Sequence, residues 1–130
     1  MIFLDTNFLV SFYIDEEEEH KRANKIMEKI KNKEKIISRV IIAETVNLMN
    51  TKLKIDKNKI EKTYNKLIED YTLIEDHYFY DNALRKTIDW ERRLPYFDFV
   101  IISVMENLGI EKIASFDKHF DNIAGIARIH

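Results

Sequence analysis

Short apolar runs alternate with longer amphipathic segments along the whole chain of 130 residues. Each run is two to four residues long, too short for a helix, and the longer segments repeat apolar residues at helical spacing. We expect strands at residues 2–4, 36–37, 72–74, 112–115 and 126–129. Strands joined by helices run parallel and are covered on both faces, so the pattern predicts an α/β fold. The expected architecture is a three-layer α/β/α sandwich with a short-stranded parallel sheet, formed as one domain over residues 1–130.

Helices are expected in the segments between these strands, at residues 8–13, 15–30, 39–54, 58–70, 77–90 and 96–108. The acidic run Asp15–Glu19 suits a helix N-terminus because the helix dipole favours negative charge there. Ser38 is predicted to be the N-cap of the third helix, and Gly109 to end the last one. Nearly every face of the 96–108 helix is apolar, so we expect part of this surface, with Phe8, Phe12 and Tyr13, to remain exposed and support a homodimer.

The composition excludes several kinds of site. The only glycines, Gly109 and Gly125, cannot form a phosphate-binding loop or a dinucleotide fingerprint. With no cysteine, disulfides, zinc knuckles and thiol nucleophiles are excluded. A net charge of −2 means that any nucleic acid must be bound by a local patch or through a cation. There is neither a signal-peptide pattern nor an apolar stretch of membrane-spanning length, so we expect a cytoplasmic protein with no membrane partner.

Two acids are predicted to follow strands, where ligand sites form in parallel sheets. Asp5 comes directly after the first strand, and Asp117 follows the fourth. Two more acids belong to helices. Glu44 falls within an apolar arc, and Asp98 opens the helix that has almost no polar face. Each acid alone also suits a turn, a cap or a solvated edge.

If the fold brings these four acids together, their charges would repel unless a cation compensates. The set offers only oxygen ligands, and no histidine or cysteine cluster competes with it. It therefore indicates Mg²⁺, with Mn²⁺ as a substitute, rather than zinc.

Four segments resemble the PIN domain family in order and spacing: Leu4-Asp5-Thr6-Asn7, Ala43-Glu44, Phe97-Asp98 and Ser115-Phe116-Asp117-Lys118-His119-Phe120-Asp121. The similarity is greatest to the VapC-type toxins of type II toxin–antitoxin systems. This resemblance implies a Mg²⁺-dependent endoribonuclease that cleaves single-stranded RNA and has an antitoxin partner. Two residues depart from the pattern: Ser115 replaces the commoner Thr, and Phe116 stands where many toxins have Arg.

The resemblance also implies roles for the four acids. Asp5, Glu44, Asp98 and Asp117 correspond to the catalytic and metal-binding acids of the family, with Asp5 and Asp98 as the principal ligands. Glu44 would also orient the attacking water. The resemblance further implies an apolar groove for the antitoxin, near the 23–30 and 39–54 helices.

Other polar residues receive weaker interpretations. His119 is taken as a surface residue and Asp121 as a loop residue. A lysine-rich segment from Lys52 to Lys66 faces only two acids within the same stretch, so it either binds phosphates or forms a solvated face.

Two other functions remain open on the sequence alone. The first is a catalytically inactive PIN-like module that binds RNA or protein, although the intact set of acids favours an enzyme. The second is a receiver or phosphatase, which also places acids at strand ends around Mg²⁺. Glu75-Asp76 follows the 72–74 strand and suits the second function, but that reading leaves Glu44 and Asp98 unexplained.

Overall fold

The predicted strands form one parallel sheet in the computed structural model, which describes residues 1–130. The strands lie in the order β3-β2-β1-β4-β5, so that β1 is central. Their bounds are β1 Ile2–Leu4, β2 Lys35–Ser38, β3 Thr72–Ile74, β4 Lys112–Ala114 and β5 Ala127–Ile129. All four strand pairs are parallel.

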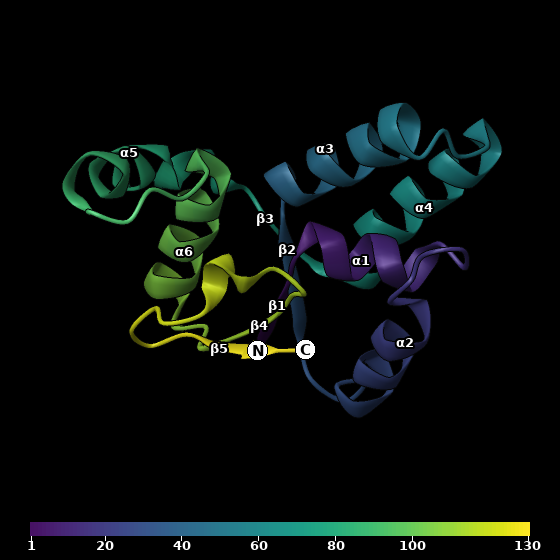
Figure 1. Ribbon diagram of the computed structural model, residues 1–130, viewed down its shortest axis with the longest axis horizontal. Helices are drawn as coiled ribbons and strands as arrows, with labels where there is room; N and C mark the ends of the chain where they lie inside the picture. Colours follow the sequence, from purple (N-terminus) through teal and green to yellow (C-terminus); the bar gives the residue numbers. More distant parts are fainter.

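Helices cover both faces of this sheet (Figure 1). They are α1 Thr6–Tyr13, α2 His20–Lys29, α3 Arg39–Asn47, α4 Lys57–Asp70, α5 Tyr80–Asp89 and α6 Tyr96–Leu108. The first four lie on one side, while α5 and α6 lie on the other. The predicted three-layer α/β/α sandwich is therefore confirmed. None of the helices is both long and apolar enough to cross a bilayer.

The direction in which strands are added reverses beside β1. From β1 the chain adds β2 and then β3 on one side, and it then crosses through α5 and α6 to place β4 on the other side. In open parallel sheets, ligands bind at the carboxyl ends of strands where the order reverses. Here that point lies between β1 and β4.

Helix α6 is the centre of the second helical layer. Every residue from Phe99 to Met105 is buried, and Phe8 of α1 is also fully buried. The expected exposure is therefore wrong for Phe8 and for the middle of α6, because the sheet and α5 cover a helix that is apolar on all sides. At the two ends of α6, Phe97 and Leu108 remain exposed as expected. Other exposed apolar side chains lie on α4 and α5, among them Ile68, Leu84 and Ile88.

The acidic run does not begin α2 as predicted. Glu17 N–H donates to the Ile14 carbonyl and His20 N–H donates to the Glu17 carbonyl, so the run forms turns and the helix starts only at His20. The predicted 39–54 helix is also modified: α3 ends at Asn47 and continues as a π-helical turn over Leu48–Lys52.

Ser38 occupies the N-cap position of α3, but its hydroxyl is buried without a hydrogen-bond partner. The free Val40 N–H donates instead to Asp76 Oδ2 at 2.8 Å. Asp76 begins a 3-10 turn, Asp76–Phe79, that precedes α5 at the start of the predicted 77–90 helix. A carboxylate 36 residues away thus supplies the cap that the sequence assigned to Ser38.

Candidate active site

Asp5 lies at the carboxyl end of β1, at the point where the strand order reverses. Leu4 pairs with Ala114 in the register of β1 and β4, which makes Asp5 and Ser115 the next residues along these two strands. The Ser115 hydroxyl donates to Asp5 Oδ2 at 2.6 Å, and the Thr6 N–H donates to Oδ1 at 2.9 Å. Asp5 is the N-cap of α1 and is only 6% exposed. One carboxylate therefore caps the helix and reaches the neighbouring strand.

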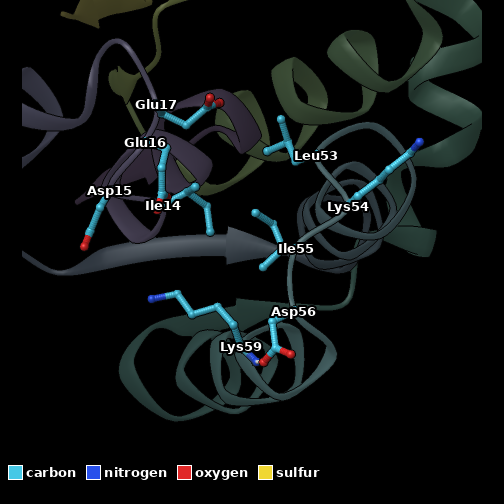
Figure 2. Close-up of a pocket in the computed structure, with 9 residues that line it drawn as sticks. All are labelled: Ile14, Asp15, Glu16, Glu17, Leu53, Lys54, Ile55, Asp56 and Lys59. Carbon is cyan, nitrogen blue, oxygen red and sulfur yellow. Dashed lines mark hydrogen bonds between the residues drawn. The ribbon is translucent and has the colours of Figure 1, made fainter.

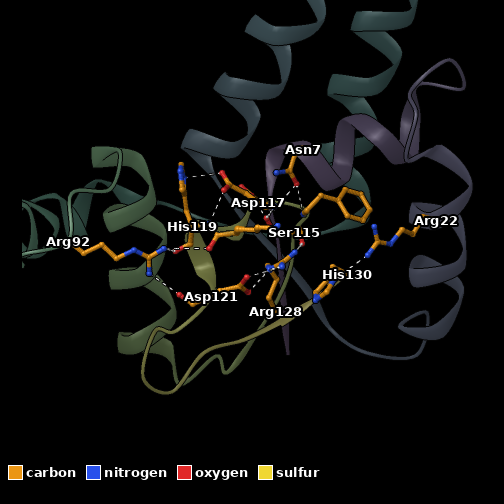
Figure 3. Close-up of polar contacts among 12 residues, drawn as sticks. Asn7, Arg22, Arg92, Ser115, Asp117, His119, Asp121, Arg128 and His130 are labelled. Atoms are coloured by element: carbon orange, nitrogen blue, oxygen red, sulfur yellow. Dashed lines mark hydrogen bonds and ion pairs between the residues drawn. The ribbon is translucent and has the colours of Figure 1, made fainter.

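The loop after β4 is tied to the start of α1 (Figure 3). Asn7 Oδ1 accepts the Phe116 N–H at 3.0 Å. The Ser115 hydroxyl, which donates to Asp5, accepts the Asp117 N–H at 3.0 Å. These bonds place Asp117 beside Asp5 although 112 positions separate them in the sequence.

Glu44 and Asp98 come to the same place from two helices on opposite sides of the sheet. Glu44 belongs to the second turn of α3, and its Oε1 lies 3.4 Å from the Thr6 hydroxyl, which donates to it. Asp98 lies in the first turn of α6. The charges of Asp98 and Asp117 raise the pKa of Asp5, and those of Asp5 and Asp98 raise the pKa of Glu44. The structure therefore brings all four predicted acids together.

His119 also contacts this site, although its side chain is 46% exposed, as expected of a surface residue. Its Nδ1 lies 2.9 Å from Asp98 Oδ2 and 3.1 Å from Asp117 Oδ2. The backbone explains the placement: Asp117 is the N-cap of a 3-10 turn, Lys118–Phe120, and its Oδ1 accepts the His119 N–H at 2.9 Å. Phe120 next to it is fully buried. The spacing Asp-x-His before a buried aromatic residue could have indicated that the His119 side chain turns back toward Asp117.

Two arginines hold the loop that carries Asp117 and His119 (Figure 3). The Arg92 guanidinium donates to the carbonyls of Asp121 and His119, both at 2.8 Å. Arg128 on β5 pairs with both Asp121 carboxylate oxygens and donates to the Ser115 carbonyl at 3.1 Å. Asp121 is therefore part of a clamp on the loop rather than one of the converging acids.

Burial and mutual repulsion raise the pKa values of the acids. Burial raises the pKa of Asp5 to about 6, against the hydrogen bonds from Ser115 and Thr6, and the charges of Asp98 and Asp117 add to the rise. Burial and the charges of Asp5 and Asp98 raise the pKa of Glu44 to about 7. The pKa of Asp98 is raised by burial, an effect that the His119 hydrogen bond partly offsets.

The chemistry of these side chains fits a divalent cation. No lysine or arginine forms an ion pair with Asp5, Glu44, Asp98 or Asp117, although each of these acids is at least partly buried. Partly buried carboxylates without a lysine or arginine partner are costly unless they are protonated or bind a cation. Ligand atoms of Asp98, Asp117 and His119 all lie within 4.8 Å of one another, close enough to share one ion.

The lysine-rich segment lies elsewhere. It includes the N-terminal turn of α4, at the end of the α3–α4 pair that points away from the sheet. Lys54 and Lys59 line a cleft of about 530 Å³ with Asp15, Glu16 and Glu17 (Figure 2). The tertiary structure thus places acids from the α1–α2 turn near Lys54 and Lys59, which have few acids near them in the sequence. This placement favours the interpretation as a solvated, charge-balanced face over phosphate binding.

The sequence matches the PIN domain family over residues 2–126, nearly the whole chain. The protein therefore belongs to the PIN domain family. Its structure is similar to that of the toxin VapC20 from Mycobacterium tuberculosis, which cleaves the sarcin–ricin loop, with a TM-score of 0.78, 20% identity and 90% of each chain covered.

A second similar structure is VapBC2 from Rickettsia felis, bound to a DNA fragment from the promoter of its genes. The TM-score is 0.68 at 16% identity, covering 99% of this chain and 98% of the other. No curated protein matches the chain by sequence.

Proposed function

We propose that this protein is an endoribonuclease that hydrolyses phosphodiester bonds of single-stranded RNA with Mg²⁺ or Mn²⁺. The observation that carries the proposal is the convergence of Asp5, Glu44, Asp98 and Asp117 where the strand order reverses, without a lysine or arginine paired to any of them. Membership of the PIN domain family supports it.

The four acids would hold the cation and prepare the attack on the phosphodiester. A bound divalent cation supplies a nucleophile at neutral pH and neutralises charge that develops on the phosphate. Asp5 and Asp98 are assigned as the principal ligands, with Asp117 beside them. Glu44 would orient the attacking water and accept its proton at a carboxylate oxygen. Ser115 and Thr6 keep the carboxylate of Asp5 in place.

We further propose that the enzyme is the toxin of a VapBC-type pair, acting in the cytoplasm. The two similar structures are a toxin and a VapBC complex. An apolar groove of about 550 Å³ between α3 and α4 is a site for an antitoxin segment, and it is lined by Ile42, Ala43, Val46 and Tyr64 among others. Residues 39–54 therefore contribute to this groove as the resemblance implies, whereas no residue of 23–30 lines it.

The two alternative functions are distinguishable. A receiver or phosphatase would use Glu75 and Asp76, but Glu75 pairs with Arg39 and Asp76 caps α3. The structure therefore gives these acids structural roles. An inactive PIN-like module would keep the fold and bind RNA or protein without cleaving RNA.

Cleavage of a single-stranded RNA, followed on a gel, tests the proposal. The wild-type protein should cleave with Mg²⁺ or Mn²⁺ and stop on addition of EDTA. Asp98→Asn should reduce the rate at least about a hundredfold, since the amide lacks the charge that holds the cation. Asp89→Asn is the matched control, because Asp89 is exposed and lies outside the site, and it should cleave normally. Cleavage that resists EDTA, or an unchanged rate in Asp98→Asn, would contradict the proposal.

A further inference from the structure

The imidazole of His119 lies between two of the proposed metal ligands. Its Nδ1 is 2.9 Å from Asp98 Oδ2 and 3.1 Å from Asp117 Oδ2. These separations match the spacing of atoms that share one ion, because two adjacent ligands of an octahedral ion at about 2.1 Å lie about 3.0 Å apart. The nitrogen is thus placed where a third ligand would be.

The backbone of His119 is held independently of the contacts of its imidazole. The His119 N–H donates to Asp117 Oδ1, and the His119 carbonyl accepts from Arg92 at 2.8 Å. The next residue, Phe120, is anchored in the core. A loop fixed at three consecutive points loses little further conformational entropy when its side chain binds an ion.

We infer that His119 is a metal ligand, and that its nitrogen biases the site toward Mn²⁺ and other transition-metal ions over Mg²⁺. Imidazole suits transition metals, whereas Mg²⁺ strongly prefers oxygen ligands and retains several waters. Loss of the nitrogen should therefore weaken Mn²⁺ binding more than Mg²⁺ binding. This assignment rests on the proposed function, since it places His119 at the same ion that Asp98 and Asp117 would hold.

Electron spin-echo spectroscopy of the protein with MnCl₂ alone tests the ligand directly. A nitrogen bonded to Mn²⁺ gives a ¹⁴N coupling, which we expect in the wild-type protein. The coupling should be lost in His119→Asn and His119→Ala. It should persist in His77→Asn, the matched control, because His77 is an exposed residue that stacks on Tyr78 away from the acids.

Calorimetric titration with MnCl₂ and with MgCl₂ tests the bias. The Kd for Mn²⁺ should rise at least about tenfold in His119→Asn, the low end of what loss of even an outer-shell partner costs. The Kd for Mg²⁺ should rise less than about threefold. Circular dichroism confirms that the variants are folded. The ¹⁴N coupling in the wild-type protein tests the ligand assignment without any variant.

Two outcomes would overturn the inference. One is a wild-type protein that binds no Mn²⁺ at millimolar concentration or binds it without a nitrogen coupling. The other is an equal loss of affinity for both ions in His119→Asn. Failure of the proposed function looks different: Mn²⁺ would bind with the nitrogen coupling, but the loaded protein would not cleave RNA.

Discussion

The Ser115 hydroxyl donates a 2.6 Å hydrogen bond to Asp5, and this bond joins the carboxyl ends of β1 and β4 across 110 positions of sequence. Both residues are buried, and the bond lies where the strand order reverses. The same hydroxyl accepts the Asp117 N–H. One side chain therefore positions two of the four acids.

Replacing Ser115 by Ala should destabilise the protein by about 1.5–3 kcal/mol at pH 8, the range for a hydrogen bond to a charged group. Ser103→Ala is the matched control: Ser103 is equally buried, but its hydroxyl has no partner, so its loss should cost nothing or stabilise. Urea denaturation measures both free energies of unfolding. Equal effects of the two substitutions would contradict the role of the Ser115–Asp5 bond.

The metal-free protein should become less stable as the pH rises from 5 to 8. The pKa values of Asp5 and Glu44 are raised from 3.8 and 4.5 to about 6 and about 7, so the folded state binds more protons than the unfolded state in this window. The loss should be on the order of 2 kcal/mol, after discounting for the partial exposure of Glu44. Urea denaturation in EDTA at several pH values measures it. Glu44→Gln should flatten the profile, and a stability that rises with pH would contradict the prediction.

Removing one charge of the cluster should abolish stabilisation by metal without harming the fold. Asp98→Asn relieves repulsion, so the metal-free variant should melt at or above the wild-type temperature. Added Mg²⁺ or Mn²⁺ should stabilise the wild-type protein by about 2.7 kcal/mol at a hundredfold excess over Kd. The variant should gain little, whereas Asp89→Asn should gain as the wild type does. Thermal denaturation with and without the ion checks this, and equal gains in all three proteins would exclude Asp98 as a ligand.

The protein should form a homodimer through the exposed face of α5. Leu84 is 46% and Ile88 59% exposed, and they lie one turn apart on the same face. Burial of such a patch is a common driving force for association. Light scattering at micromolar concentration should give twice the 15.6 kDa mass of one chain. Ile88→Asp should yield monomers, whereas Ile68→Asp on α4 should not. A monomeric wild-type protein would refute this prediction and leave the nuclease proposal untouched.

Much of the fold was predictable because it depends on neighbouring residues. The strand positions, the parallel sheet and most helix positions follow from short apolar runs and from helical spacing, which act over a few residues. The acids Asp5 and Asp117 were predictable as neighbours because each lies just beyond the end of a strand, and the carboxyl ends of parallel strands meet at one edge. Glu44 and Asp98 were identifiable because an acid in an apolar helix needs a partner.

The remaining features depend on contacts between distant segments, and those are decided only when the core packs. The tertiary structure made Asp76 the cap of α3, placed acids of the α1–α2 turn in one cleft with Lys54 and Lys59, and buried the middle of α6. It also brought His119 to Asp98, 21 positions away. Local spacing determines which elements form and which of their faces is apolar. It does not determine which polar side chains meet, because that depends on the relative position of whole elements, which long-range packing sets.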